Sequence, residues 1–366
     1  MHQLIVTPFL ENHLVLRPGS AKGVKISTAK YRQLAQSASD EQTPEWFAQA
    51  VRECWGLDVA DRSLGTIALV RQQSSYGFAR CSYELNLFCN LECKICYLGE
   101  KVSAGLPWPE RERLLHVMRD SGVVWLQLTG GEPLIDRLFP EVYRLSHELG
   151  MMTSISSNGT NLANPNILEL LTAYRPYRLT LSVYGASEQS YEGQTQRRGS
   201  YTKFIRGLDA AREAGLPIRL SIIVTKDSEH EVDQMKALAD NYGWPYHVYA
   251  NMSPTIYGGD ESLPSQSAAH MTKRKAFTGC NAGHTHYHVD PLGKASICKV
   301  GREPNIPLME EGVEGLRRLG VIGDSLLTRQ GGCGGCQLSG SCGTCMPLAT
   351  LYRQAKASLA SYCQHG

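Results

Sequence analysis

Short apolar runs alternate with amphipathic segments through the middle of the chain. Between about residues 76 and 255, six runs rich in β-branched or aromatic residues are bounded by turn residues and predict strands. These runs are 78–87, 123–128, 151–156, 178–184, 218–224 and 247–250. Five segments between them repeat apolar residues at helical spacing, at 110–118, 139–149, 167–173, 204–214 and 232–242.

This alternation predicts an α/β fold built on a parallel sheet. Strands that are joined through helices pair in parallel, because parallel pairing needs a crossover connection. Six strand-helix units fall short of the eight that close a full barrel, so we expect a partial (β/α)6 TIM-type barrel that is open on one side. A large substrate could enter through that opening.

The first 75 residues have a different pattern and predict a small N-terminal α+β module. Two β-like runs, 3–7 and 13–17, precede helical patterns at 28–36 and 44–55. Thr43 is expected as the N-cap of the second helix and Pro44 as its first residue, because proline is favoured at that position.

The last third of the chain changes again, with frequent glycine, histidine and cysteine. Helical periodicity is confined there to 312–319 and 347–360. The segment 331–343 has scarcely any apolar side chain to bury. We therefore expect residues 256–366 to be held together by metal coordination rather than by core burial.

Size and charge narrow the class of protein. The 366 residues are too many for one ordinary core and favour two or three domains. The formal charge of +2 and the pI near 7.9 argue against a nucleic-acid partner, since basic nucleic-acid domains have a pI above roughly 9. No apolar run approaches the ~18 residues of a membrane span, and residues 1–10 lack a cationic signal-peptide start. We expect a cytoplasmic protein without a membrane partner.

Twelve cysteines are too many to be incidental in a reduced compartment, where disulfides are rare, so metal ligation is the leading explanation. Three of them, Cys89, Cys93 and Cys96, lie in the sequence CNLECKICY just after the first predicted barrel strand. A loop with this spacing can hold one face of a 4Fe-4S cluster and leave the fourth iron without a protein ligand. The alternatives are an incomplete zinc site, although zinc prefers four ligands, and buried free thiols.

On these cysteines the chain resembles the radical S-adenosyl-L-methionine (SAM) superfamily, and a second motif strengthens the resemblance. Thr129-Gly130-Gly131-Glu132-Pro133 follows the second predicted strand, as the family's Gly-Gly-Glu motif does. The resemblance implies that Gly130, Gly131 and Glu132 meet the amino group and carboxylate of SAM. Adjacent glycines let a backbone approach a ligand closely, and Glu132 would accept hydrogen bonds from the ammonium.

The resemblance implies further SAM contacts at the ends of later strands. Ser157 and Asn158, in the sequence SSNG, and Ser182 would contact the ribose and the methionine moiety. Arg198 matches a basic residue near the SAM carboxylate, with Arg197 as an alternative. A strand-ending turn and a solvated arginine are the structural alternatives. These positions are the carboxyl ends of barrel strands, where barrel enzymes place their chemistry.

The C-terminal third resembles the SPASM domain, a twin-cluster extension of radical SAM enzymes that modify peptides and proteins. The motifs that carry this resemblance are Cys280, Gly293-x4-Cys298, Cys333-x2-Cys336-x5-Cys342-x2-Cys345 and Cys363. The family's interleaved ligation implies two auxiliary 4Fe-4S clusters. One would be held by Cys333, Cys336, Cys342 and Cys363, and the other by Cys280, Cys298 and Cys345.

Two features depart from the SPASM pattern. The last cysteine step is x2 where the family usually has x3, and His286 stands where fully ligated members have another cysteine. Either His286 coordinates, as histidines do on Rieske irons, or one iron is open to substrate. The histidines at 284, 286 and 288 equally fit polar positions of a strand. As an alternative, Cys333, Cys336, Cys342 and Cys345 could form a zinc knuckle, but this would leave three cysteines unexplained. Cys54 and Cys81 match no ligand position and are expected to be packed thiols.

The resemblance implies an oxidoreductase whose catalytic cluster is held by Cys89, Cys93 and Cys96. The reduced cluster would give one electron to SAM, releasing methionine and a 5'-deoxyadenosyl radical that removes a hydrogen atom from an unactivated carbon. A flavodoxin- or ferredoxin-type protein would supply that electron. The auxiliary clusters would accept the electron that the substrate radical loses, so the net result is a two-electron oxidation such as a crosslink or a dehydrogenation.

A ribosomally made precursor peptide is the predicted substrate, because SPASM extensions mostly accompany peptide maturation. The segment Ser182-Val183-Tyr184-Gly185 resembles peptide maturases, and residues 1–75 resemble a leader-peptide recognition domain. Such a module could bind a leader at a sheet edge or simply cap the barrel. The alternatives are a radical dehydrogenase of a small molecule and a non-catalytic iron-sulfur or zinc scaffold. Candidate bases near the predicted mouth are Tyr184, Tyr257, Asp260 and Asp290.

Overall fold

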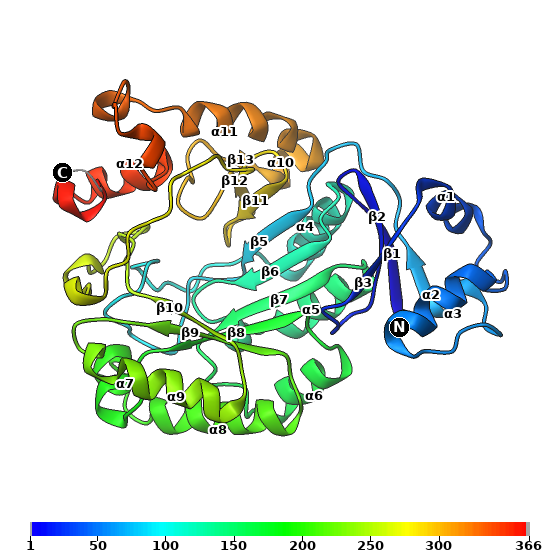
Figure 1. Cartoon of the computed structure of the whole chain (residues 1–366), viewed down its shortest axis with the longest axis horizontal. Coiled ribbons are helices and arrows are strands. Elements are labelled where there is room, and N and C mark those ends of the chain that lie inside the picture. Colours follow the sequence, from blue (N-terminus) through cyan, green and yellow to red (C-terminus); the bar gives the residue numbers. More distant parts are fainter. Residues whose placement is uncertain (1, 364–366) are drawn as a thin grey trace.

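The computed structural model describes residues 2–363, and its centre is one mixed sheet of nine strands (Figure 1). Six neighbouring strands of this sheet run parallel, in the order β10-β9-β8-β7-β6-β5. They are β5 (Arg80–Glu84), β6 (Trp125–Thr129), β7 (Met152–Ser157), β8 (Arg178–Val183), β9 (Ile218–Ile223) and β10 (Tyr246–Tyr249). All six predicted strands are therefore present, and the predicted partial barrel is confirmed.

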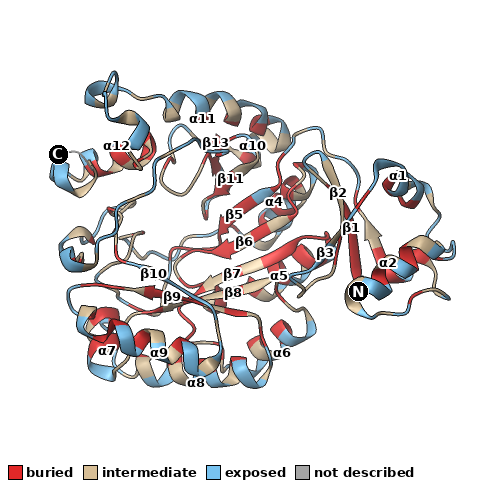
Figure 2. Ribbon diagram, viewed as in Figure 1, coloured by how far each residue is buried: buried red, intermediate tan, exposed pale blue. Residues whose placement is uncertain are grey.

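Helices between these strands cover the outer face of the sheet, whose strands carry many of the buried residues (Figure 2). They are α4 (Trp108–Asp120), α5 (Phe139–Glu148), α6 (Pro165–Ala173), α7 (Glu188–Thr195), α8 (Ser200–Glu213) and α9 (Val232–Tyr242). The sequence pattern did not predict α7, because its residues EQSYEGQT carry no apolar stripe. Its start is fixed instead by a side-chain cap, in which Ser187 accepts from the backbone N–H of Ser190.

The C-terminal region continues the barrel sheet. Strand β11 (His286–Val289) pairs in parallel with β5, and β12 (Lys294–Ser296) and β13 (Ile306–Pro307) extend the sheet antiparallel. Tyr287 and Val289 are buried in the same core as the barrel residues. The expectation that metal coordination rather than core burial holds residues 256–366 is therefore wrong for this part of the region.

Beyond the sheet, the C-terminal region is made of short helices. The predicted helix at 312–319 is a 3-10 helix, Gly312–Arg318, whose two glycines disfavour α-helix, and a regular helix follows it. The regular helices are α10 (Leu308–Glu311), α11 (Leu319–Leu327) and α12 (Met346–Gln354). Only short 3-10 turns occur between Gly331 and Ser341, as the lack of apolar residues there predicts.

The N-terminal residues form a separate four-stranded sheet in the order β3-β2-β1-β4. Its elements are β1 (Leu4–Phe9), β2 (Asn12–Leu16), β3 (Gly23–Ile26), α1 (Thr28–Gln36), α2 (Glu45–Trp55), α3 (Leu64–Ile67) and β4 (Ala68–Val70). The prediction of Thr43 as an N-cap is wrong: α2 begins at Glu45, and Pro44 is its N-cap without a side-chain hydrogen bond. The Thr43 hydroxyl is used elsewhere, since it donates to the Arg62 carbonyl at 2.7 Å.

This N-terminal module packs against the amino ends of the barrel strands. Ile5 and Leu16 share a small core with Val124, and the rings of Phe9 and Trp125 lie 4.7 Å apart between centroids. The buried guanidinium of Arg71 donates to the Val123 carbonyl at 2.7 Å and so ties the end of the module to the start of β6. In Figure 1 the arrowheads of β6, β7 and β8 accordingly point away from the module.

Among the helices that the structure describes, none combines the length and the apolar character that crossing a bilayer requires.

Candidate active site

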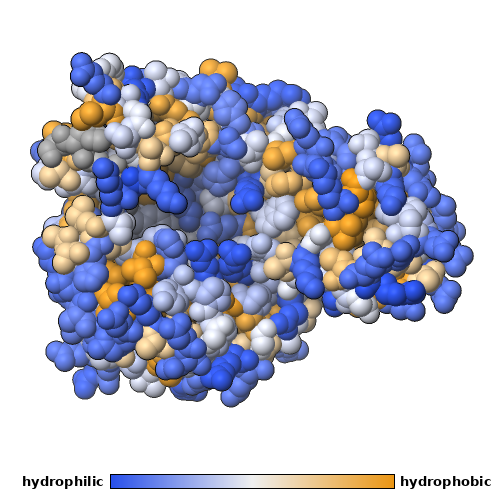
Figure 3. Space-filling view, viewed as in Figure 1, coloured by the Kyte–Doolittle hydropathy of each residue, from blue (hydrophilic) through white to orange (hydrophobic). Residues whose placement is uncertain are grey.

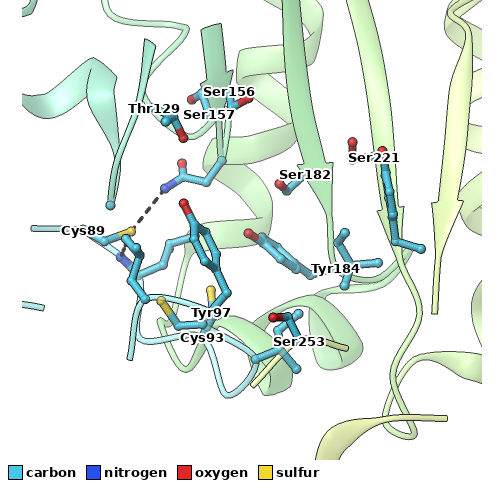
Figure 4. Close-up of a pocket in the computed structure, with 18 of the residues that line it drawn as sticks. Cys89, Cys93, Tyr97, Thr129, Ser156, Ser157, Ser182, Tyr184, Ser221 and Ser253 are labelled. Carbon is cyan, nitrogen blue, oxygen red and sulfur yellow. Dashed lines mark hydrogen bonds between the residues drawn. The ribbon is translucent and has the colours of Figure 1, made fainter. Parts of the chain in front are cut away.

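A cavity of about 470 Å³ lies at the carboxyl ends of β6 to β10 (Figure 4). The face seen in Figure 3 is hollowed between the C-terminal region and the barrel helices α7 to α9. Strand ends and the loop after β5 together form most of the cavity wall. Of the predicted site residues, the structure brings together in this wall Cys89, Cys93, Cys96, Gly130, Gly131, Ser157, Asn158 and Ser182.

The cysteine loop has no regular secondary structure and is held by backbone hydrogen bonds. The N–H groups of Glu92 and Lys94 donate to the carbonyls of Thr195 and Gln194, at 2.9 and 3.1 Å. These carbonyls belong to the last turn of α7, where helices leave such acceptors free. The helix that the sequence pattern missed is therefore one of the supports of the cysteine loop.

The three sulfurs fit an iron-sulfur cluster with one open iron. Asn158 approaches Cys89, with its Nδ2 3.8 Å from the Cys89 Sγ (Figure 4). Burial raises the pKa of the Cys89 thiol to about 12 and also raises that of Cys93, so these sulfurs stay neutral unless a metal binds to them. Three thiol ligands that border a common open cavity match three-cysteine ligation of a 4Fe-4S cluster. In residues 2–363, no group of three or more His, Cys, Asp or Glu side chains is arranged to hold a single metal ion.

The two glycines after β6 lie directly against the cysteine loop. The N–H of Gly131 donates to the Asn86 carbonyl, and that of Glu132 donates to the Phe88 carbonyl, both at 2.9 Å. A Cβ atom at Gly131 would lie 2.1 Å from the Phe88 carbonyl oxygen, and Gly130 has a φ of +135°, which other residues rarely adopt. From the sequence, we expected these glycines to let the backbone approach a ligand closely. The structure shows that they are also needed because the cysteine loop packs directly against them.

Replacing Gly131 with Ala is therefore expected to push the loop that carries Cys89 away from β6. We expect SAM to bind at least about tenfold more weakly to anaerobically reconstituted Gly131→Ala protein, because displacement of a supporting group costs roughly tenfold to a hundredfold in such sites. Isothermal titration with SAM measures the loss. Gly193→Ala is the matched control, since a Cβ there meets nothing within 4 Å. Equal SAM affinity of wild type and Gly131→Ala would contradict this account of the turn.

The Glu132 carboxylate lies behind the glycine turn and is fully buried. It accepts hydrogen bonds from the Ser157 hydroxyl at 2.7 Å, the Asn158 N–H at 2.6 Å and the Leu134 N–H at 3.0 Å. Burial raises its pKa to about 7, although the hydrogen bonds from Asn158, Ser157 and Leu134 oppose that rise. In this structure Glu132 therefore braces the end of β7, and it does not contribute to the cavity wall.

Several other predicted residues lie outside the wall. Arg197 and Arg198 are exposed in the turn after α7 and do not line the cavity. Of the candidate bases, Tyr184 lines it, whereas Tyr257, Asp260 and Asp290 do not. The wall also contains residues that the sequence reasoning missed, namely Tyr97, Lys101, Thr180, Tyr249, Asn251, Ser253 and Lys299. Tyr97 had the clearest signal, because it follows Cys96 directly.

The seven cysteines of the C-terminal region fall into two groups in space. Cys333, Cys336, Cys342 and Cys363 line one cavity of about 320 Å³, and Cys280, Cys298 and Cys345 interact electrostatically with one another. Cys81 is buried on β5 and Cys54 is partly buried on α2, so both are apart from these groups. This grouping is the one that the SPASM resemblance implies, and it separates Cys345 from the other three members of the alternative zinc knuckle.

The three histidines of this region have different surroundings. The Nε2 of His284 lies 2.8 Å from an oxygen of Asp324, and the Nδ1 of His288 lies 2.8 Å from the Ser82 hydroxyl. Burial lowers the pKa of His286 to about 4, so its imidazole is neutral at neutral pH, as a metal ligand must be. His286 is also the first residue of strand β11.

Comparison with known proteins identifies the part of the chain that holds the cavity. Residues 83–239 match the sequence profile of the Radical SAM superfamily. This part of the chain is a radical SAM domain. It includes Cys89, Cys93 and Cys96, the Gly130-Gly131 turn and the strand ends up to Ser221.

Curated relatives of the radical SAM domain carry several named activities. The AdoMet-dependent heme synthase of Methanosarcina barkeri is 31% identical over 50% of this chain and 52% of its own length. The sporulation killing factor maturation protein SkfB of Bacillus subtilis is 25% identical, with 57% of this chain and 50% of that protein covered. The mycofactocin maturase MftC of Mycobacterium ulcerans is 25% identical, with 60% and 63% covered. The chain thus spans half to under two thirds of these relatives.

A solved structure extends the similarity of fold beyond the radical SAM domain. The chain superposes on the structure of Streptococcus suis SuiB bound to S-adenosylmethionine over 94% of each chain, with a TM-score of 0.59 and 14% sequence identity. At this identity the comparison establishes the shared fold, which includes the partial barrel.

A buried ion pair joins the radical SAM domain to the C-terminal region. Glu84, at the end of β5, is fully buried and accepts from both terminal nitrogens of Arg302, at 2.8 and 2.9 Å. Tyr97, next to Cys96, donates to the same carboxylate at 3.2 Å. Burial opposes ionisation of Glu84, but the imidazole of His288, 3.6 Å away, and the two hydrogen bonds from the Arg302 guanidinium outweigh it and lower the pKa. The pair therefore connects the loops that carry Cys96 and Cys298.

Proposed function

We propose that this chain is a radical SAM oxidoreductase that modifies a ribosomally made precursor peptide. The observation that carries the proposal is the convergence of Cys89, Cys93 and Cys96 with the Gly130-Gly131 turn in one cavity. A 4Fe-4S cluster and SAM, when bound there, supply a radical that abstracts hydrogen from carbon. The chain itself holds these groups, orients the substrate and limits access of water.

Each set of residues has its own task in this proposal. Cys89, Cys93 and Cys96 hold the cluster, and the hydrogen bond from Asn158 fixes the position of the Cys89 sulfur. The backbone of Gly130 and Gly131, with the hydroxyls of Ser157 and Ser182, contacts SAM. Glu132 supports this arrangement through Ser157 and Asn158. Arg198 would have to move with the turn after α7 to reach the SAM carboxylate.

Three 4Fe-4S clusters make the proposed oxidation complete. One auxiliary cluster is assigned to Cys333, Cys336, Cys342 and Cys363, and a second to Cys280, Cys298 and Cys345, completed by His286 or by substrate. A flavodoxin- or ferredoxin-type donor would supply one electron, and a cluster held by these cysteines would accept the electron that the substrate radical loses together with a proton. The peptide is thereby oxidised by two electrons, as in a crosslink or a dehydrogenation.

A peptide substrate is favoured by two of the relatives and by one of the solved structures. SkfB and MftC are named as maturation proteins, and SuiB has been solved with its precursor peptide SuiA. Residues 1–75 are assigned to leader recognition, because β3 is an edge strand whose free side can pair with an extended peptide. Residues 76–255 are assigned to the radical SAM barrel and 256–366 to the SPASM domain, in a protein that works in the cytoplasm.

Anaerobic reconstitution followed by SAM cleavage under dithionite is the first test. Co-expression with short peptides encoded near this gene then identifies the substrate by mass, and a loss of two hydrogen atoms supports oxidation. Formation of 5'-deoxyadenosine without modification of any such peptide favours the alternative, a dehydrogenase of a small molecule. Complete absence of 5'-deoxyadenosine leaves only a non-catalytic iron-sulfur or zinc scaffold.

A further inference from the structure

The wall of the active-site cavity carries two ammonium groups and no carboxylate. Among the described residues that line it, Lys101 and Lys299 are the only ones of the Asp, Glu, Lys or Arg types. Charged groups in partly enclosed sites are normally paired, because an isolated charge loses hydration without compensation. The cavity therefore has the charge expected of a binding site for an anionic group.

The two lysines differ in what already surrounds them. The Nζ of Lys101 lies 3.3 Å from an oxygen of Glu92, and Lys101 interacts electrostatically with Cys89 and Cys93. Lys101 therefore belongs to the cysteine loop and has its own counter-ion. The Lys299 carbonyl accepts from the Arg302 Nε at 2.8 Å. The Lys299 ammonium has no hydrogen bond or ion pair with any residue between 2 and 363, and its Nζ lies 5.9 Å from the centroid of the Tyr97 ring.

The acidic group that acts on Lys299 is already engaged by another cation. Glu84 interacts electrostatically with Lys299, but both of its oxygens accept from Arg302, at 2.8 and 2.9 Å. Arg302 itself adds a second positive charge that repels Lys299. Among residues 2–363, the Lys299 ammonium is thus left without a carboxylate partner at the wall of the cavity.

We propose that Lys299 binds a carboxylate of the substrate peptide, either an acidic side chain or the C-terminal carboxylate, and so determines which peptide segment enters the cavity. This inference rests on the proposed function. A carboxylate is also present in SAM, but the predicted SAM contacts come from the ends of β6, β7 and β8 and, for the carboxylate, from Arg198 in the turn after α7, whereas Lys299 comes from the C-terminal region. The substrate is therefore the better partner.

The position of Lys299 in the chain adds a reason for this role. Lys299 directly follows Cys298, and its ammonium lies near Tyr97, which directly follows Cys96. A carboxylate held by Lys299 is thus placed between the loop of the catalytic cysteines and a cysteine assigned to an auxiliary cluster. A carbon next to that carboxylate would be within reach of both sites.

The test uses reconstituted full-length enzyme with SAM and fluorescently labelled heptapeptides. One pair of peptide amides differs only in a central Glu or Gln, and a second pair differs only in a free or amidated C-terminus. We expect wild type to bind one carboxylate peptide about tenfold more tightly than its neutral partner, as for a charge-assisted hydrogen bond. Lys299→Gln should lose this discrimination, and Lys299→Arg should keep most of it. Lys294→Gln, an exposed lysine on β12, is the matched control.

Three outcomes would overturn the inference. They are equal binding of both members of each pair to wild type, no binding of any of these peptides, and a Lys299→Gln variant that loses affinity for SAM but keeps its peptide discrimination. Iron content and SAM cleavage under dithionite are measured on the same samples. Absent SAM cleavage by wild type would refute the proposed function, whereas normal cleavage without discrimination refutes only the role of Lys299. If Lys299→Gln loads no iron, the inference is tested by the peptide discrimination of the wild type and of Lys299→Arg.

Discussion

Replacing Cys93 with Ala is expected to abolish reductive cleavage of SAM while the C-terminal clusters remain. Cys93 is one of three sulfurs that line the cavity, and a cluster with two protein ligands loses the arrangement that leaves a single iron open. The iron content should fall from about twelve to about eight atoms per chain, as expected for loss of one of three 4Fe-4S clusters. Production of 5'-deoxyadenosine under dithionite and iron analysis measure the two effects.

Cys54→Ala is the matched control for this experiment. Cys54 lies on α2 in the N-terminal module, far along the chain from every cysteine assigned to a cluster, and it is only partly buried. The control should keep its full iron content and its cleavage of SAM. Cleavage retained by the Cys93→Ala protein would remove the basis of the proposed active site.

Replacing Glu84 with Gln is expected to lower the free energy of unfolding by about 3–5 kcal/mol, the usual cost of breaking a buried ion pair. Glu84 is fully buried, and the substitution leaves the Arg302 guanidinium without its charged partner. Because the pKa of Glu84 is lowered in the folded protein, the ion pair stabilises the fold at every pH above about 4, where a free carboxyl group titrates. This contribution is lost as the pH falls below that range. Thermal unfolding of the anaerobic holoenzyme at neutral pH measures the loss.

Two further variants distinguish the stabilising effect of the buried Glu84–Arg302 pair from the general effect of removing a charge. Asp58→Asn removes an exposed partner of Arg52 and is expected to leave the unfolding temperature unchanged. Adding Arg302→Met to Glu84→Gln should cost less than the sum of the single changes, because the unpaired cation is then gone. A Glu84→Gln protein as stable as Asp58→Asn would show that the pair contributes nothing to the junction of the two regions.

The strands and helices of the barrel were predictable because their signals are local. Apolar runs rich in β-branched or aromatic residues located all six barrel strands, and helical patterns located five of the six barrel helices, most of them with small errors at the ends. Helix α7 escaped because it has no apolar stripe. The pairing of β11 with β5 escaped because it joins residues about two hundred positions apart, such as Tyr287 and Cys81. Sequence periodicity is local and cannot reveal pairing between distant segments. For this reason the C-terminal region was expected to lack a core.

The candidate site was predictable where residue spacing carries chemistry. The three cysteines, the two glycines and the polar residues that end β7 and β8 do meet in one cavity. Lys299 carried no such signal, because only the three-dimensional arrangement shows that its neighbour Glu84 is already engaged by Arg302. The internal use of the Glu132 carboxylate was equally invisible, since two of its three donors, Ser157 and Asn158, depend on how β7 lies beside β6.

The N-terminal module and the cavity lie at opposite ends of the barrel strands, and this separation sets a minimum tether for any peptide that uses both. A strand of six residues is roughly 20 Å long at about 3.3 Å per residue. A leader held at the edge of β3 therefore needs at least about six extended residues, and more to turn around the rim, before its chain reaches the cysteine loop. Peptides with shorter tethers would be recognised without being modified, so distance along the substrate would act as a second layer of selectivity.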